Sequence, residues 1–303
     1  MGENKFLNQE YSLAQEGRNM KGETKRFRTA SIISSGFFTI AILISVGLIA
    51  FTVVFFYSEV RGTSMMHRLN PYYFQANAVN GGNNTDSVLV NRFANPSRGD
   101  IIVTRFYRTN GQHQSPDGRF CFFIKRVIAL PGDTVFFHRI PLTNPTSFAN
   151  DRFEIQVNGV PIDEYYLDTT RWGQNLVTGH YVRLLNWLEG GNLHANDGFY
   201  NTGWQRQFIQ YVTHTPANGS PFTRREIVIP QGYVFYMGDN RGGDGSTGEN
   251  GDRQWKSFDS SDFGPERTNL IVGVVVDVAR NQSLPAYMWN WVVHIFTFRW
   301  IWG

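Results

Sequence analysis

The feature that most constrains this chain is its longest uncharged run. From Thr29 to Ser58 there is no Asp, Glu, Lys or Arg. At about 1.5 Å per residue, a helix of this length would cross a hydrocarbon core roughly 30 Å thick. A cleaved signal peptide is the competing interpretation, but its apolar core would span roughly 7–15 residues and end at small residues. The run therefore predicts one uncleaved transmembrane helix over residues 29–58.

The charges beside this run predict its orientation. Glu59 follows it, and four basic residues precede it: Lys21, Lys25, Arg26 and Arg28. Because Lys and Arg tend to remain on the cytoplasmic side, residues 1–28 are expected in the cytoplasm and everything after residue 58 outside it. The chain is thus predicted to be a single-pass protein of the plasma (inner) membrane.

Beyond the anchor, the sequence is typical of β structure. Short segments rich in Val, Ile, Phe and Tyr, such as "DIIVTRFY", "FFIKRVIAL" and "LIVGVVVDV", are separated by Gly, Pro, Asn and Asp. No stretch after residue 70 combines sustained helical periodicity with caps. The predicted fold is mainly β: a single N-terminal transmembrane helix, then an antiparallel β domain with an inserted β subdomain.

Changes in composition predict the internal boundaries. Residues 136–230 are rich in Asn, Thr, Tyr and Trp and are interpreted as the inserted, more exposed β subdomain. This insertion divides the core into residues 59–135 and 231–280. The tail, residues 281–303, holds four of the eight tryptophans. Trp favours the membrane interface, so the tail is either a membrane-surface contact or a strand pair packed on the core.

Several classes of site are not supported by composition. Residues 78–86 and 241–254 are expected to be loops, the second one mobile, and the Asp residues of the second do not match an EF-hand.

The 28 Lys and Arg and 25 Asp and Glu give a net charge of +3 without the basic stripe of a nucleic-acid-binding protein. The lone Cys121 excludes an intrachain disulfide and a Cys-cluster zinc site. We expect no metal, no cofactor and no nucleic acid.

One serine and one lysine could carry chemistry together. Ser64 follows Gly62 in a small-residue turn, which alone means little. Lys125 lies in the apolar segment "FIKRVIALPGD", and burial would lower the pKa of its amine toward neutrality. A neutral amine beside a serine can act as general base. Alternatively, Lys125 alternates outward into solvent, and His67 would then be the first candidate base.

Five segments carry a resemblance to a known family. "VRGTSMMHRL", "RGDIIV", "FIKRVIALPGDTV", "YMGDNR" and "SFDSSDFG" resemble, in order and character, the conserved boxes of bacterial type I signal peptidases. The boxes to which they belong cover residues 60–69, 98–103, 123–135, 233–241 and 257–264. Members of that family are membrane-anchored Ser-Lys proteases that remove signal peptides from exported proteins.

The resemblance implies a role for each matching residue. Ser64 would be the nucleophile and Lys125 the general base, without a cofactor. Ser257 would hydrogen-bond and orient the base, and Met65 would pack near the site. The charged and polar support would come from Arg126, Asp239, Asn240, Arg241 and Asp259.

Three departures from the family pattern stand out. His67 and Arg68 replace a usual Pro-Thr pair, so this loop is expected to be less rigid. Gly62 lacks the hydroxyl that assists the oxyanion in some relatives, which leaves more of that work to the Ser64 backbone N–H. Ser261 replaces an arginine, so one supporting ion pair is expected to be missing.

The resemblance also implies partners. The substrates would be signal-peptide-bearing preproteins held in the lipid bilayer near the export channel, cut after small residues at the outer membrane face. An extended substrate would pair with a strand edge, near residues 100–103 or after Ser64. Two alternatives stay open: a specialised Ser-Lys processing peptidase of a secretion or conjugation system, and a non-catalytic membrane-tethered binding protein.

Overall fold

The computed structural model describes residues 34–60, 62–66, 68–69, 85–106, 121–140, 152–167, 179–189, 203–216, 219–241, 244–247, 253–255 and 257–279. The chain forms two compact units, residues 1–54 and 55–303. The described part of the first unit is one helix, Ser34–Val54, long and apolar enough to cross a membrane. Its apolar side chains are exposed, as at Phe38 (74% exposed). A helix that is apolar on all faces suits lipid as its solvent, which agrees with a membrane anchor.

The helix is shorter than the uncharged run that predicted it. It ends at Val54, and the last apolar residues of the run belong to a strand, β1 (Phe55–Glu59). All five residues of β1 pair with β2. The prediction of helix to residue 58 is therefore wrong by four residues, because aromatic side chains such as Phe55 and Tyr57 suit a strand equally well.

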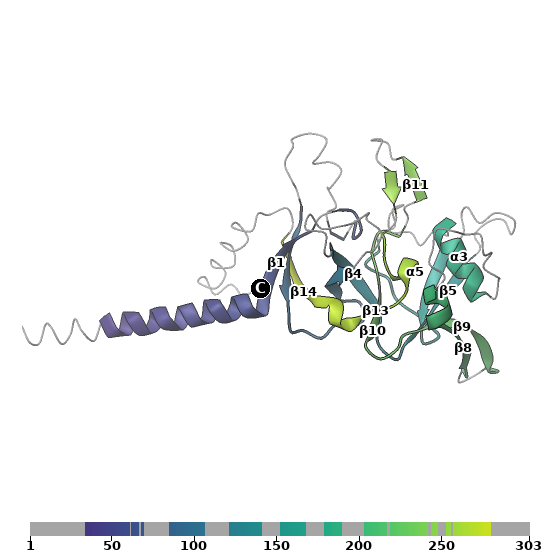
Figure 1. Ribbon diagram of the computed structural model, residues 1–303, viewed down its shortest axis with the longest axis horizontal. Coiled ribbons are helices and arrows are strands. Elements are labelled where there is room, and N and C mark those ends of the chain that lie inside the picture. The colour runs from purple at the N-terminus through teal and green to yellow at the C-terminus, as the bar shows by residue number, and fades with distance from the viewer. Residues whose placement is uncertain are drawn as a thin grey trace, which may run out of the picture. The chain divides into compact units, whose positions relative to one another are not determined.

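A seven-stranded antiparallel sheet forms the first layer of the second unit (Figure 1). Its order is β1, β2 (Ser87–Asn91), β14 (Ile271–Ala279), β3 (Ile101–Phe106), β4 (Cys121–Ala129), β10 (Tyr233–Met237) and β13 (Glu266–Arg267). Because side chains alternate along a strand, β3 and β4 supply two separate apolar clusters. Val103 and Ile124 belong to one, and Ile102 and Val127 belong to the other.

A five-stranded antiparallel sheet forms from the residues between β4 and β10. Its order is β7 (Val160–Pro161), β6 (Arg152–Val157), β5 (Thr134–Ile140), β9 (Phe222–Val228) and β8 (Ile209–His214). Helix α3 (Gly179–Leu188) lies beside β5 in Figure 1, and α4 (Gly203–Phe208) precedes β8. Both sheets are antiparallel, so the predicted mainly β fold after one N-terminal apolar helix is confirmed.

The expectation of no helix after residue 70 is wrong. Helix α3 buries Tyr181, Leu184, Leu185 and Leu188 against the five-stranded sheet. These positions follow the i, i+3, i+4, i+7 pattern of an amphipathic helix. The pattern is only ten residues long and lies in a polar region, so it was overlooked.

The smaller elements correct one loop prediction. Within residues 241–254, β11 (Asp244–Thr247) pairs antiparallel with β12 (Arg253–Trp255), so part of this predicted loop is a strand pair. Helix α5 (Ser260–Phe263) and the 3-10 turn η2 (Thr268–Leu270) complete the described elements. Residues 78–84 and the tail 281–303 lie outside the described residues.

Candidate active site

Ser64 lies in a tight turn that is fixed by its apolar neighbours. Gly62 has φ +91, in the region that favours glycine, and the Met66 N–H donates to the Thr63 carbonyl at 3.1 Å. Met65 is 1% exposed and packs into the cluster that includes Ile124. The turn therefore buries Met65 while Ser64 itself stays half-buried.

Lys125 lies on β4 and faces the interior. It is 2% exposed, which confirms the predicted burial and excludes the solvated alternative. Its Nζ lies 4.9 Å from the centroid of the Phe123 ring, two residues earlier on the same face. That ring stacks on Phe106 of β3 at a centroid distance of 4.8 Å. Aromatic side chains from β3 and β4 thus lie beside the Lys125 amine.

The strand register sets Gly238 opposite Lys125. On β10, Met237 pairs with Arg126 of β4, and continuing this antiparallel register by one residue places Gly238 across from Lys125. Directly opposed residues of an antiparallel pair point to the same face of the sheet. A Cβ atom added to Gly238 would therefore point to the same face of the sheet as the Lys125 side chain.

On that face, Gly238 is in close contact with both candidate serines. A Cβ atom on Gly238 would lie 2.1 Å from Ser257 Oγ and 2.3 Å from the Ser64 carbonyl oxygen. Only glycine fits such a close approach. Gly238 thus brings Ser64 and Ser257 together, although the two serines are far apart in the sequence.

Asn240 holds the backbone of the Ser64 turn in place. Its backbone N–H donates to the Ser64 carbonyl at 3.1 Å, and its Nδ2 donates to the Thr63 carbonyl at 3.1 Å. The Asn240 carbonyl in turn accepts from the Ser257 N–H at 3.0 Å. One buried asparagine therefore connects the turn that carries Ser64 with the segment that carries Ser257.

A buried ion pair fixes the segment just before Asn240. Arg126 donates from Nε and Nη2 to the two carboxylate oxygens of Asp239, at 2.9 and 2.6 Å. Its Nη1 donates to the Gly99 carbonyl at 2.7 Å. Arg126 is 5% exposed and Asp239 is 1% exposed. This bidentate geometry ties β4 to the end of β10.

Asp259 satisfies a second set of donors in the same region. It accepts from the Gly238 N–H at 3.0 Å and from the Ser261 N–H and Oγ at 3.1 and 2.7 Å. The Asp259 N–H donates back to Asp262, which forms a capping box at the start of α5. Ser261 thus supplies hydrogen bonds to Asp259 at the position where the family pattern has an arginine.

The sequence analysis did not identify two residues that contact the site's arginines, Glu164 and Tyr166. Glu164 Oε1 lies 2.9 Å from Arg241 Nη2, and the Arg126 guanidinium carbon lies 3.9 Å from the centroid of the Tyr166 ring. A buried arginine needs a carboxylate partner. Had the burial of Arg241 been expected, a search for an acidic partner would have followed. Nothing in the sequence selects Glu164 among the 25 acidic residues.

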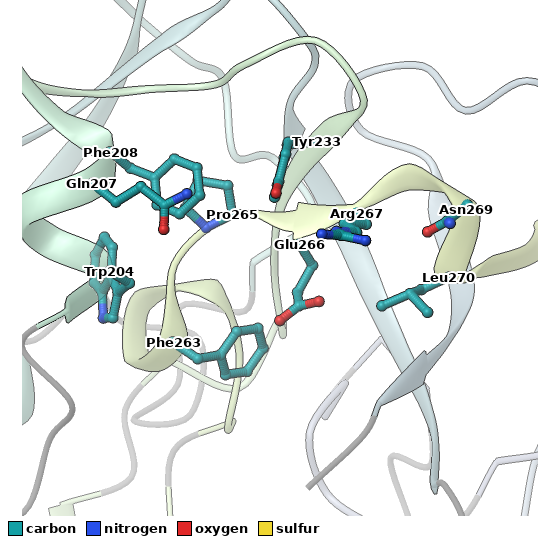
Figure 2. A pocket seen from close by; sticks show the side chains of 10 residues that line it. All are labelled: Trp204, Gln207, Phe208, Tyr233, Phe263, Pro265, Glu266, Arg267, Asn269 and Leu270. Atoms are coloured by element: carbon teal, nitrogen blue, oxygen red, sulfur yellow. The ribbon is translucent and has the colours of Figure 1, made fainter.

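A separate cavity lies between α4 and β13 (Figure 2). It has a volume of about 660 Å³ and is lined in part by Phe208, Tyr233, Phe263 and Glu266. Burial raises the pKa of Glu266 above its usual value. The lining residues do not include any of the candidate site residues, so this cavity is distinct from the Ser64 region.

Sequence comparison assigns a family. A family model described as signal peptidase, peptidase S26, matches residues 32–247, which is more than half of the chain. The matched range includes Ser64, Lys125 and the segment 238–241. A comparison with curated protein sequences found no significant match.

Proposed function

The chain belongs to the signal peptidase family of serine peptidases, peptidase S26, and from this premise we propose that it cleaves signal peptides from exported preproteins. Ser64 is the nucleophile and Lys125 the general base. The observation that carries this assignment is the close contact of Gly238 with the Ser64 carbonyl and with Ser257, at the position opposite Lys125.

The proposed reaction passes through two steps. Lys125 Nζ, neutral in its buried site, takes the Ser64 Oγ proton as Oγ attacks the scissile carbonyl. The tetrahedral intermediate collapses to an acyl-enzyme, and the protonated Lys125 returns the proton to the leaving amine. Water, activated by the same amine, then releases the acid product and free Ser64. Ser257 orients the Lys125 amine throughout.

The oxyanion is proposed to bind at the Ser64 backbone N–H. A fixed N–H donor stabilises the negative charge as it develops. The hydrogen bonds on the carbonyl side of this backbone support the role, because Asn240 donates to the Ser64 and Thr63 carbonyls. That clamp fixes the orientation of the turn before the substrate arrives.

The membrane arrangement follows from the anchor. The apolar helix supports membrane attachment, and the flanking charges support a cytoplasmic segment 1–28 with the catalytic domain outside. Residues 59–135 and 231–280 form the catalytic core, and residues 136–230 are inserted into it. Substrates are preproteins emerging near the export channel, which present small residues before the cleavage site and pair with the chain after Ser64. The other expected strand edge, at residues 100–103, is wrong, because β3 lies between β14 and β4 and is paired on both sides.

The test is preprotein cleavage by the full chain in liposomes. Ser64→Ala, Lys125→Ala and the charge-keeping Lys125→Arg are each expected to lower kcat about 1000-fold or more, as for other covalent-catalysis residues. Ser220→Ala, at an exposed position, is the matched control. Near-normal cleavage by Lys125→Ala would remove Lys125 from the mechanism, and His67 would be tested next as the base.

A further inference from the structure

A short segment of the five-stranded sheet reaches into the support of the candidate active site. Residues 162–167 follow β7, and two of their side chains contact buried arginines of the seven-stranded sheet region. Glu164 meets Arg241 and Tyr166 meets Arg126. These contacts join residues that are far apart in the sequence.

The Glu164 contact leads to Gly238. Arg241 is 0% exposed, and its Nε donates to the Gly238 carbonyl at 2.6 Å. Burial alone would lower the pKa of Arg241, but the nearby Glu164 carboxylate reverses this and raises it. Arg241 therefore stays charged, and the Glu164 carboxylate, 2.9 Å from its Nη2, fixes the direction in which Nε points.

The Tyr166 contact leads to Asp239 and closes the network. Burial raises the pKa of Tyr166, so its hydroxyl stays protonated and donates to Glu164 Oε1 at 3.0 Å. Its ring covers the Arg126 guanidinium, and Arg126 binds Asp239 through two hydrogen bonds. Both arms of the network thus end on adjacent residues, Gly238 and Asp239.

We propose that Glu164 and Tyr166 are positioning residues that set the placement of the segment 238–241 and, through it, of Ser64. The inference rests on the proposed function, because it assigns a role around the Ser64 nucleophile. Gly238 and Asn240 touch the Ser64 carbonyl directly, so a shift of this segment moves the nucleophile. The contacts described for Glu164 and Tyr166 are with Arg241 and Arg126, so both residues act on Ser64 through these arginines.

This role predicts a loss in kcat rather than in substrate affinity. A displacement of about 1 Å at the reacting atoms is able to cost about 100-fold in rate. Glu164→Gln keeps the shape of the side chain but removes the charge that directs Arg241. We expect kcat to fall at least about tenfold, with KM within about twofold of wild type.

The experiment measures kcat and KM for preprotein cleavage by the full chain in liposomes, well below the unfolding midpoint of every variant. The variants are Glu164→Gln, Glu164→Asp and Tyr166→Phe, and the matched control is Asp163→Asn, an exposed neighbour. Glu164→Asp, which keeps the charge, is expected to retain more kcat than Glu164→Gln. Tyr166→Phe, which removes only the hydroxyl, is expected to lose several-fold in kcat.

A double variant separates positioning from stability. Arg241→Met in the Glu164→Gln background removes the buried charge that has lost its Glu164 partner, so the unfolding midpoint should recover. The kcat should stay low, because methionine has no N–H for the Gly238 carbonyl. Recovery of kcat together with the midpoint would show a merely structural role and overturn the inference.

The remaining outcomes are decisive as well. Wild-type kcat in Glu164→Gln, or in Tyr166→Phe if the first variant does not fold, overturns the positioning role. If Ser64→Ala is inactive in the same assay, only that role falls. If Ser64→Ala cleaves normally, the proposed function falls and this inference falls with it.

Discussion

The two larger sheets of this protein use buried charged and polar side chains in different ways. In the five-stranded sheet, the fully buried Glu226 contacts His214 and Arg224, which belong to the same β8–β9 hairpin. In the seven-stranded sheet, Arg126 binds Asp239 across 113 residues, and Asn240 reaches Thr63 across 177. The first arrangement fixes a local register, whereas the second fixes the relative placement of distant segments.

Because of this difference, substitutions in the two sheets should affect stability and activity differently. Loss of a contact inside a hairpin should lower the free energy of unfolding but leave the candidate site intact. Loss of a contact that joins distant segments should also move the residues around Ser64. The predictions below test that separation, and each pairs a substitution near the site with one elsewhere.

The largest effect is expected from Gly238→Ala. The added Cβ would overlap Ser257 and the Ser64 carbonyl, so both must move, and cleavage should fall more than about 100-fold. The control is Gly273→Ala on β14, where a Cβ would lie 2.5 Å from the Asn91 carbonyl. Both variants should have lower unfolding midpoints, but only Gly238→Ala should lose kcat in its folded state. Equal losses in kcat would contradict the comparison.

The next effect is expected from Asp239→Asn. It leaves Arg126 buried without its carboxylate, which should cost about 3–5 kcal/mol of stability and about 100-fold in kcat. Glu226→Gln should also lower the urea midpoint, but kcat measured below that midpoint should match wild type. A loss of kcat in Glu226→Gln would mean that the two sheets are not separable in this way.

A pH-dependent effect is expected at Asp133, in the turn between β4 and β5. Burial would raise the pKa of Asp133, but hydrogen bonds from Arg98, the Leu130 N–H and Asn158 outweigh it and hold the pKa below its usual value. A lowered folded-state pKa gives stability that is present above the unfolded-state pKa and lost as pH falls through the folded-state pKa.

Urea unfolding between neutral and acidic pH measures this contribution. The urea midpoint of wild type should decline as the solution becomes acidic enough to protonate Asp133. Asp133→Asn should have a lower midpoint at neutral pH and a shallower decline with pH, with kcat near wild type. A decline as steep as that of wild type would assign the acid sensitivity to other carboxylates.

The smallest effect is expected at Gly62. Its φ of +91 makes alanine unfavourable by about 1–2 kcal/mol, although, chain neighbours aside, no atom of the described residues lies within 4 Å of the added Cβ. Gly232→Ala, with φ +80 and equally open space, is the matched control. Similar unfolding midpoints are expected, with a several-fold lower kcat only for Gly62→Ala, because that turn carries Ser64. Identical kcat values would show that the turn tolerates the strain.

Much of the architecture could be predicted from local patterns. An uncharged run predicts a lipid-facing helix, and short apolar segments between turn residues predict strands, because both depend on neighbouring residues. The apolar flanks of Lys125 were compatible with burial or with an outward side chain, and the structure shows it buried. The roles of Ser64 and Lys125 stay predictions, as do those of Ser257 and Met65.

The remainder depends on contacts that a linear sequence does not contain. Taken singly, Asp239, Arg241 and Asp259 would be assigned to the solvated surface, yet each is at most 1% exposed. Their burial is possible only because partners arrive from distant segments, such as Glu164 for Arg241. The helix α3 and the β11–β12 pair were missed because short elements are decided by the surrounding packing.

Adjacent residues on β4 have consequences for how the chain folds. Lys125 pairs with Ile102 and Arg126 with Ile101 on β3, and a slip of one residue would exchange the faces of the two cations. The slipped strand would bury the guanidinium without Asp239, at a cost of several kcal/mol. The Arg126–Asp239 pair therefore favours the native alignment of β4 over an alignment shifted by one residue.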